Sequence, residues 1–119
     1  MRDDDLIRLR HMQDAAIEAL GFTCGRSRDE LDHDRQLEWA LVKAIEIIGE
    51  AAGQLSNEAK GELPKIPWRN IVGMRNRLVH AYFDINRSIL WKTVVEGLPP
   101  IIAELQQVIP RMPDVSDNQ

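Results

Sequence analysis

Apolar residues recur at intervals of three and four along almost the whole chain, the spacing of helices that bury one face. This pattern predicts four to five helices, over residues 4–20, 34–55, 67–79 and 87–109, the last kinked or restarted at 98–100. The widest apolar stripe lies between Asp34 and about Leu55, which we expect to be the central helix. No strand alternation is present, so the predicted fold class is all-α, an antiparallel helical bundle.

The segments between these helices carry turn and cap residues. Gly21 is a stop signal for the first helix, and residues 23–32 are predicted to form a loop with at most one helical turn. Ser56 and Asn57 can cap a short turn in the connector 56–68. Asn86 is a plausible cap for the helix that begins near Arg87.

Gly49 and Gly53 lie one turn apart inside the predicted central helix. Glycine destabilises a helix interior, so the pair is expected where another backbone packs closely. One interpretation is an interface with a partner helix, which would favour a dimer.

The chain length of 119 residues with 44% hydrophobic content fits one domain, over residues 1–110, with a flexible tail at 111–119. No apolar run is long enough to span a membrane, so we expect no membrane partner. The N-terminal residues do not resemble a signal peptide, and a cytoplasmic location is expected. Cys24 is the single cysteine, which excludes an internal disulfide and a multi-cysteine zinc site.

A formal net charge of -4 argues against nucleic-acid binding through overall charge, and no DNA partner is expected. A local basic site remains possible, because the stretch "MRNRLVHAYFDI" (74–85) concentrates arginine, asparagine and histidine. Arg69, Arg75 and Arg77 lie within nine residues. Arginine is suited to bidentate contacts with phosphate.

Helical spacing divides this segment into two faces. Ile71, Met74 and Leu78 are expected to face the core, and the opposite stripe contains Arg69, Gly73, Asn76 and His80. Arg75 and His80 would point about 140° apart on a continuous helix. They can converge if the helix ends between them or if a second subunit supplies one of them. If the chain becomes extended after His80, Tyr82 lies on the His80 side.

These residue types suit phosphoryl chemistry on RNA. Histidine can exchange protons with a ribose 2′-hydroxyl or a leaving oxygen near neutral pH. Arginine can stabilise negative charge on phosphate oxygens, and Asn76 can hydrogen-bond phosphate or the histidine. The three histidines are not arranged at ligand spacing, so we predict no metal site and no cofactor. From the residues alone, helix capping and surface ion pairs are the favoured interpretation.

The stretch "PWRNIVGMRNRLVHAYFDIN" (67–86) resembles the motif of the HEPN superfamily, in particular the HepT-like ribonuclease toxins. In that motif an arginine and a polar residue precede a histidine, and a tyrosine follows two positions later; Arg75, Asn76, His80 and Tyr82 match. The segments 44–56 ("AIEIIGEAAGQLS"), 66–68 and 89–106 are also similar to the family, and the resemblance covers roughly residues 3–109.

The resemblance implies a dimer with a composite cleft and metal-independent endoribonuclease activity, with Arg75 and His80 catalytic. Asn76 would support them, together with Arg77, Arg69 and, on the central helix, Glu50, for which a structural role is equally open. It also implies the toxin of a type VII-like toxin–antitoxin system. A minimal nucleotidyltransferase antitoxin would silence it by transferring AMP to Tyr82.

Two alternatives remain open. A non-catalytic helical module could use the same arginines to bind a nucleotide or a nucleotidyltransferase partner. A purely structural dimerising subunit would not depend on Arg75 and His80 at all.

Overall fold

The computed structural model describes residues 1–81 and 84–109, and for Arg75, Val79, His80, Ala81 and Asp84 it describes the backbone alone. The predictions for Tyr82 and for the tail at 111–119 therefore lie outside the described residues. The elements, in chain order, are α1 (Asp3–Thr23), the 3-10 helix η1 (Arg28–Asp32), α2 (Arg35–Gly53), α3 (Asn57–Gly61), α4 (Trp68–Leu78), β1 (Val79–Ala81), β2 (Asp84–Ile85), α5 (Arg87–Lys92), the π-helical turn η2 (Thr93–Gly97) and α6 (Leu98–Val108). The predicted all-α class is confirmed, with one short hairpin added.

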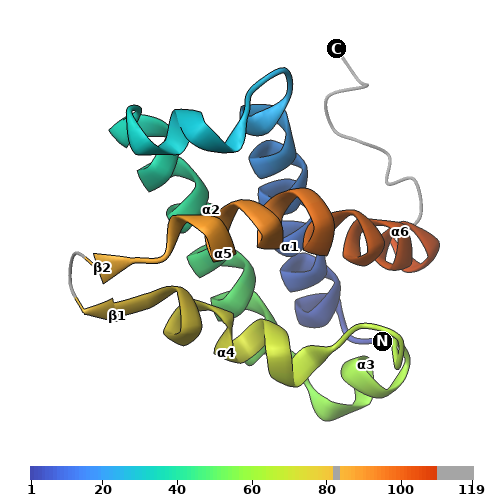
Figure 1. The fold of residues 1–119 in the computed structure, drawn as a ribbon. Coiled ribbons are helices and arrows are strands. Elements are labelled where there is room, and N and C mark those ends of the chain that lie inside the picture. Colours follow the sequence, from blue (N-terminus) through green and yellow to red (C-terminus); the bar gives the residue numbers. More distant parts are fainter. Residues whose placement is uncertain (82–83, 110–119) are drawn as a thin grey trace.

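The long helices form two antiparallel pairs that cross one another. Helix α1 runs alongside α2 in the opposite direction, and α5, η2 and α6 continue as one rod across both (Figure 1). Helix α4 packs on α2 and runs opposite to that rod. No helix in the described part of the chain is both long and apolar enough to cross a membrane.

One buried core joins these helices. Its largest fully buried side chains come from every long helix and include Leu9, Met12, Leu41, Ile45, Ile48, Ile71, Leu78, Leu90, Leu98 and Leu105. Helices α2, α4 and α6 each turn one apolar face to this core, as the sequence spacing predicts.

The caps predicted at Ser56 and Asn86 are confirmed, whereas Asn57 lies inside α3. The Ser56 hydroxyl accepts a hydrogen bond from Ala59 N at 3.1 Å, and Asn86 Oδ1 accepts one from Ile89 N at 3.0 Å. The predicted stop at Gly21 is wrong, because α1 continues to Thr23. The chain turns instead at Gly25, whose φ of 74° lies in the left-handed region that favours glycine.

The two glycines of α2 have different surroundings. A Cβ added to Gly49 would lie 3.5 Å from the Ile71 carbonyl oxygen of α4, whereas one added to Gly53 would meet nothing within 4 Å. The close backbone at Gly49 therefore belongs to the same chain. This contact accounts for Gly49 within one chain, and the interpretation of the pair as an intermolecular interface stays a prediction.

The predicted break at residues 98–100 takes the form of a π-helical turn. Pro99 and Pro100 have no N–H to donate to the carbonyls four residues earlier. Helix α6 begins at Leu98, directly after η2, so the prolines lie in its first turn, where their missing donors are tolerated.

Candidate functional site at the end of helix α4

Helix α4 has the two predicted faces. Ile71, Met74 and Leu78 are buried. On the opposite stripe Arg69 and Asn76 are exposed, and neither makes a hydrogen bond or ion pair with another described residue. The stripe therefore leaves polar groups available to a ligand.

The helix ends between the two residues of the motif. Arg75 lies in α4, which ends at Leu78, and the backbone of His80 lies in β1. The separation of 140° on a continuous helix therefore does not apply. Arg75 and His80 can converge if the helix ends between them or if a second subunit supplies one of them. The first of these conditions is met within a single chain.

His80 lies at an irregularity in the hairpin. Strand β1 pairs with β2 at Val79 with Ile85 and at Ala81 with Asp84, so three residues of β1 face two of β2. His80 is the additional residue, as in a β-bulge. Bulges bend a strand and redirect side chains, and they are frequent beside active sites. The side chains of Arg75 and His80 lie outside the described atoms, so their catalytic roles stay predictions.

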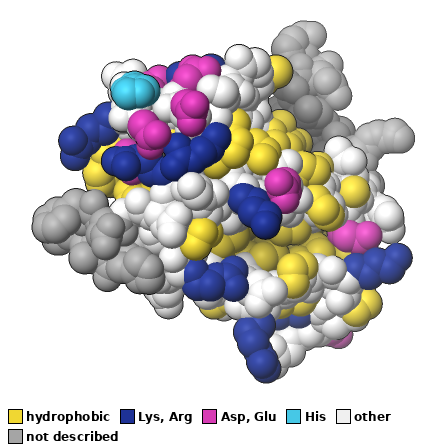
Figure 2. All heavy atoms as spheres, in the orientation of Figure 1, with side chains coloured by type: hydrophobic (Ala, Val, Ile, Leu, Met, Phe, Trp, Pro, Cys, Tyr) yellow, Lys and Arg dark blue, Asp and Glu magenta, His cyan; other side chains and the backbone are white. Residues whose placement is uncertain are grey.

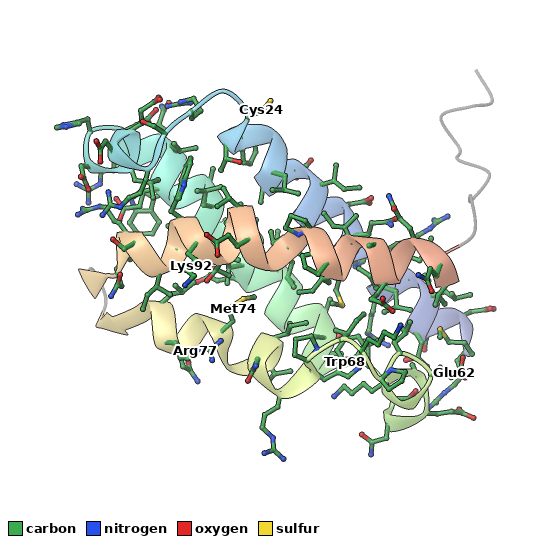
Figure 3. The ribbon with its side chains drawn as sticks, turned by 45° about the vertical axis from the view of Figure 1, so that its right-hand side comes forward. Cys24, Glu62, Trp68, Met74, Arg77 and Lys92 are labelled. Carbon is green, nitrogen blue, oxygen red and sulfur yellow. The ribbon has the colours of Figure 1, made fainter. Side chains whose placement is uncertain are left out.

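Arg77 lies beside a different feature, a groove of about 400 Å³ between α4 and the α5–α6 rod. Its guanidinium donates to the Asn70 carbonyl at 3.3 Å. Met74 and Lys92 also line this groove, and Figure 3 shows both between the two helices. Most of the remaining lining is apolar, including Ile71, Ile89, Leu98 and Ile101.

Glu50 is exposed on α2 and lines a third groove, of about 270 Å³. The other residues of this groove, among them Arg8 and His11, come from α1, from α2 and from Gln54 directly after α2. No described residue of α4 lines that groove. Glu50 therefore does not share the groove beside Arg77, and it makes no hydrogen bond or ion pair with Arg69, Asn76 or Arg77 among the described residues.

Sequence reasoning missed a depression of about 290 Å³ between η1, α2 and β2. Its residues are Leu31, Asp32, His33, Arg35, Glu38, Trp39, Ile85 and Arg87. Glu38 is buried, and its carboxylate lies 3.3 Å from the Arg87 guanidinium. The one signal in the sequence was a tryptophan next to Glu38 near the start of α2. The Glu38–Arg87 pair depends on the tertiary fold.

Ion pairs cover the η1 side of this depression. Arg26 donates to Asp34 at 2.6 Å and also pairs with Glu30. The bond from Arg26, followed by the Ser27 N–H, lowers the pKa of Glu30, and the Leu37 N–H, followed by Arg26, lowers the pKa of Asp34. Figure 2 shows positive and negative side chains interleaved over this end of the molecule, whereas those along the α4 side stand further apart. Both acids are therefore ionised, and they share the single guanidinium of Arg26.

No group of three histidine, cysteine, aspartate or glutamate side chains within the described residues could hold a metal ion. The side chains of His80 and Asp84 are not among those described.

Comparisons with known proteins identify the family of the chain. The family described as "Ribonuclease HepT-like" matches residues 12–108. "Putative RNase MJ1380" of Methanocaldococcus jannaschii is 36% identical over 95 residues, which are 80% of this chain and 87% of that protein. "Probable ribonuclease HepT" of Thermococcus cleftensis is 40% identical over 75 residues, 63% of this chain and 68% of that protein. No solved structure matches. The chain therefore belongs to the HepT-like ribonuclease family.

Proposed function

We propose that the chain is a metal-independent endoribonuclease, the toxin of a type VII-like toxin–antitoxin system, with Arg75 and His80 as catalytic residues. The observation that carries the proposal is the end of α4 at Leu78, between these two residues, in a HepT-like chain. The relatives named above carry ribonuclease in their names, which supports RNA as the substrate.

In the proposed reaction the neutral His80 imidazole removes the proton of a ribose 2′-hydroxyl. The 2′-oxygen attacks the adjacent phosphorus, and the bond from phosphorus to the 5′-oxygen breaks. The imidazolium returns its proton to that leaving oxygen, so the products are a 2′,3′-cyclic phosphate and a 5′-hydroxyl. Arg75 stabilises the negative charge on the phosphorus oxygens, and Asn76 hydrogen-bonds the phosphate or His80.

The supporting residues differ in how well their surroundings suit the proposed roles. Arg69 is exposed and unpaired among the described residues, so it can contact a phosphate on the substrate. Arg77 is also exposed and uses one N–H on a backbone carbonyl. Glu50 directly follows Gly49, which packs on α4, and its supporting role stays a prediction.

The proposal includes a second copy of the chain and a silencing partner. Two motifs would meet in a composite cleft of a homodimer. A minimal nucleotidyltransferase antitoxin would transfer AMP to Tyr82. The added phosphate would then occupy the substrate phosphate position beside His80 and pair with the arginines.

Cleavage of RNA in EDTA tests the ribonuclease. We expect His80→Ala and Arg75→Ala to lower the rate by about 10²- to 10⁴-fold, the usual contribution of a general acid–base or a charge-stabilising group. His11→Ala and Arg10→Ala, matched changes on α1, should cleave as the wild type does. Equal cleavage by all variants would reject the proposal. Nucleotide binding without any cleavage would favour the non-catalytic module.

Intact mass after incubation with the nucleotidyltransferase and ATP tests the silencing step. One added AMP on the wild type and none on Tyr82→Phe is the expected result. Expression of the chain alone should arrest growth, and His80→Ala should relieve the arrest.

A further inference from the structure

The depression between η1, α2 and β2 exposes an aromatic side chain. Trp39 is 48% exposed, whereas Trp68 and Trp91 are half-buried against the core. Arg35 and Lys43, one turn before and one turn after Trp39 on the same helix face, are also exposed. An aromatic side chain between two cations on one face is an arrangement that binds single-stranded RNA, by base stacking and by phosphate contacts.

One arginine at the depression has no carboxylate partner among the described residues. The two acids of the depression are matched, since Asp32 lies 3.1 Å from the Arg28 guanidinium and Glu38 is paired with Arg87. Arg35 makes no ion pair with any other residue that the structure describes. Arg35 is therefore a cation available to an anion, although the lining residues hold two acids and two arginines and the whole chain is acidic.

The depression borders the hairpin that carries the motif histidine. Ile85 lines it, and Ile85 pairs with Val79, the residue directly before His80. Paired residues in neighbouring strands lie about 5 Å apart, so the depression begins within a few ångströms of the His80 backbone. A strand of RNA with a phosphate at the motif therefore has a neighbouring nucleotide within reach of Trp39.

We infer that this depression is a substrate subsite, which binds a nucleotide adjacent to the scissile phosphate of single-stranded RNA. Its base stacks on Trp39, and a phosphate of the same strand is held by Arg35. The inference rests on the proposed ribonuclease function and adds to it a preference for unpaired RNA, because a base inside a duplex is not free to stack on a side chain.

The test measures RNA affinity separately from cleavage. In the His80→Ala background, fluorescence anisotropy follows binding of a labelled single-stranded oligoribonucleotide. Trp39→Ala should weaken binding by about 5- to 150-fold, the effect of losing one stacked base, and Trp39→Phe should retain most of the affinity. Phe22→Ala, a matched change at an exposed aromatic residue of α1, should have no effect. A duplex of the same sequence should bind equally to the Trp39→Ala variant and its parent.

Arg35→Ala keeps the experiment decisive if Trp39→Ala fails to fold. This variant should weaken binding and reduce the slope of log affinity against log salt by about one phosphate contact, whereas Lys65→Ala, in the connector before α4, should change neither.

The outcomes separate this inference from the ribonuclease proposal. If the chain cleaves RNA but Trp39→Ala and Arg35→Ala leave the RNA affinity unchanged, the subsite alone is overturned. Absence of both cleavage and RNA binding in the starting proteins rejects the ribonuclease and the subsite together. If Trp39→Ala changes the mass in light scattering but not RNA affinity, the surface is a protein interface and the subsite is overturned.

Discussion

Helix α4 is held differently at its two ends. At its start the Trp68 indole packs on the core and donates to the Lys60 and Leu63 carbonyls at 3.1 and 3.0 Å. At its end the chain passes directly into β1, and the Leu78 carbonyl accepts a bond from Asn86 N at 3.1 Å. The indole therefore anchors the start, whereas beyond the buried Leu78 a backbone hydrogen bond holds the hairpin that carries the motif histidine.

The contacts that follow the hairpin are also polar. Asn86 caps α5, and Arg87 pairs with Glu38. Each such contact contributes about 1 kcal/mol, much less than a buried aromatic side chain. A site built at this end can adjust to a substrate without loss of the fold, as expected for functional segments drawn from the less stable parts of a protein. The comparison indicates that the start of α4 contributes mainly to stability, whereas the candidate site lies at its end.

The largest expected effect is at the start of α4. Trp68→Ala removes a core contact and leaves two carbonyls with one donor fewer, so the free energy of unfolding should fall by about 3 kcal/mol in urea. Cleavage per folded molecule should stay unchanged. Trp39→Ala is the matched control, and its stability should lie within about 0.5 kcal/mol of the wild type. Equal destabilisation by the two variants would show that the start of α4 is not specifically anchored by Trp68.

The start of α4 and its neighbours were predicted from local patterns. The caps at Ser56 and Asn86 need only residues a few positions apart, and the buried face of α4 follows from spacing. The boundary predicted at Gly21 failed because a helix tolerates glycine unless the fold requires a positive φ, and here the turn comes at Gly25.

The end of α4 shows what local patterns do not contain. The bulge at His80 depends on how β1 and β2 pair, and the neighbour of Gly49 depends on where α4 packs. Likewise, nothing in the sequence pairs Glu38 with Arg87, which lies 49 residues away. The identities of the motif residues were readable from the sequence, whereas the depression beside them was not.

A smaller effect is expected on the hairpin side. Arg87→Ala leaves the buried Glu38 carboxylate without its partner and should cost about 1–2 kcal/mol, less than for a fully buried pair because Arg87 is partly exposed. Glu38→Gln in the same background should recover part of this loss, so a double-mutant cycle in urea should give a coupling of about 1 kcal/mol. Arg28→Ala, which breaks the exposed pair with Asp32, should cost less. If the losses of unfolding free energy for the Arg87 and Glu38 variants were additive, this pair would not hold the chain that follows β2.

The smallest effect on stability is expected only at acidic pH. It concerns the connector that leads into the start of α4. Asp5, in the first turn of α1, is buried and accepts bonds from Ser56 N at 3.0 Å and Ser56 Oγ at 2.7 Å. These two bonds hold the pKa of Asp5 below its usual value of 3.8. The native state therefore favours the charged form, and its stabilisation is complete above the unfolded pKa and is lost as the pH falls through the lowered one.

The difference in unfolding free energy between the wild type and Asp5→Asn should accordingly be constant from about pH 7 to pH 5 and should narrow below about pH 4. Asp3→Asn is the matched control, because Asp3 lies in the same turn of α1 but is exposed and makes no hydrogen bond with another described residue. Its difference from the wild type should depend less on pH. If both variants followed the same acid profile, the interaction with the helix dipole rather than the Ser56 contacts would account for the shift. The hydrogen bonds between Asp5 and Ser56 would then stabilise the fold no more than the contacts that hold the hairpin do.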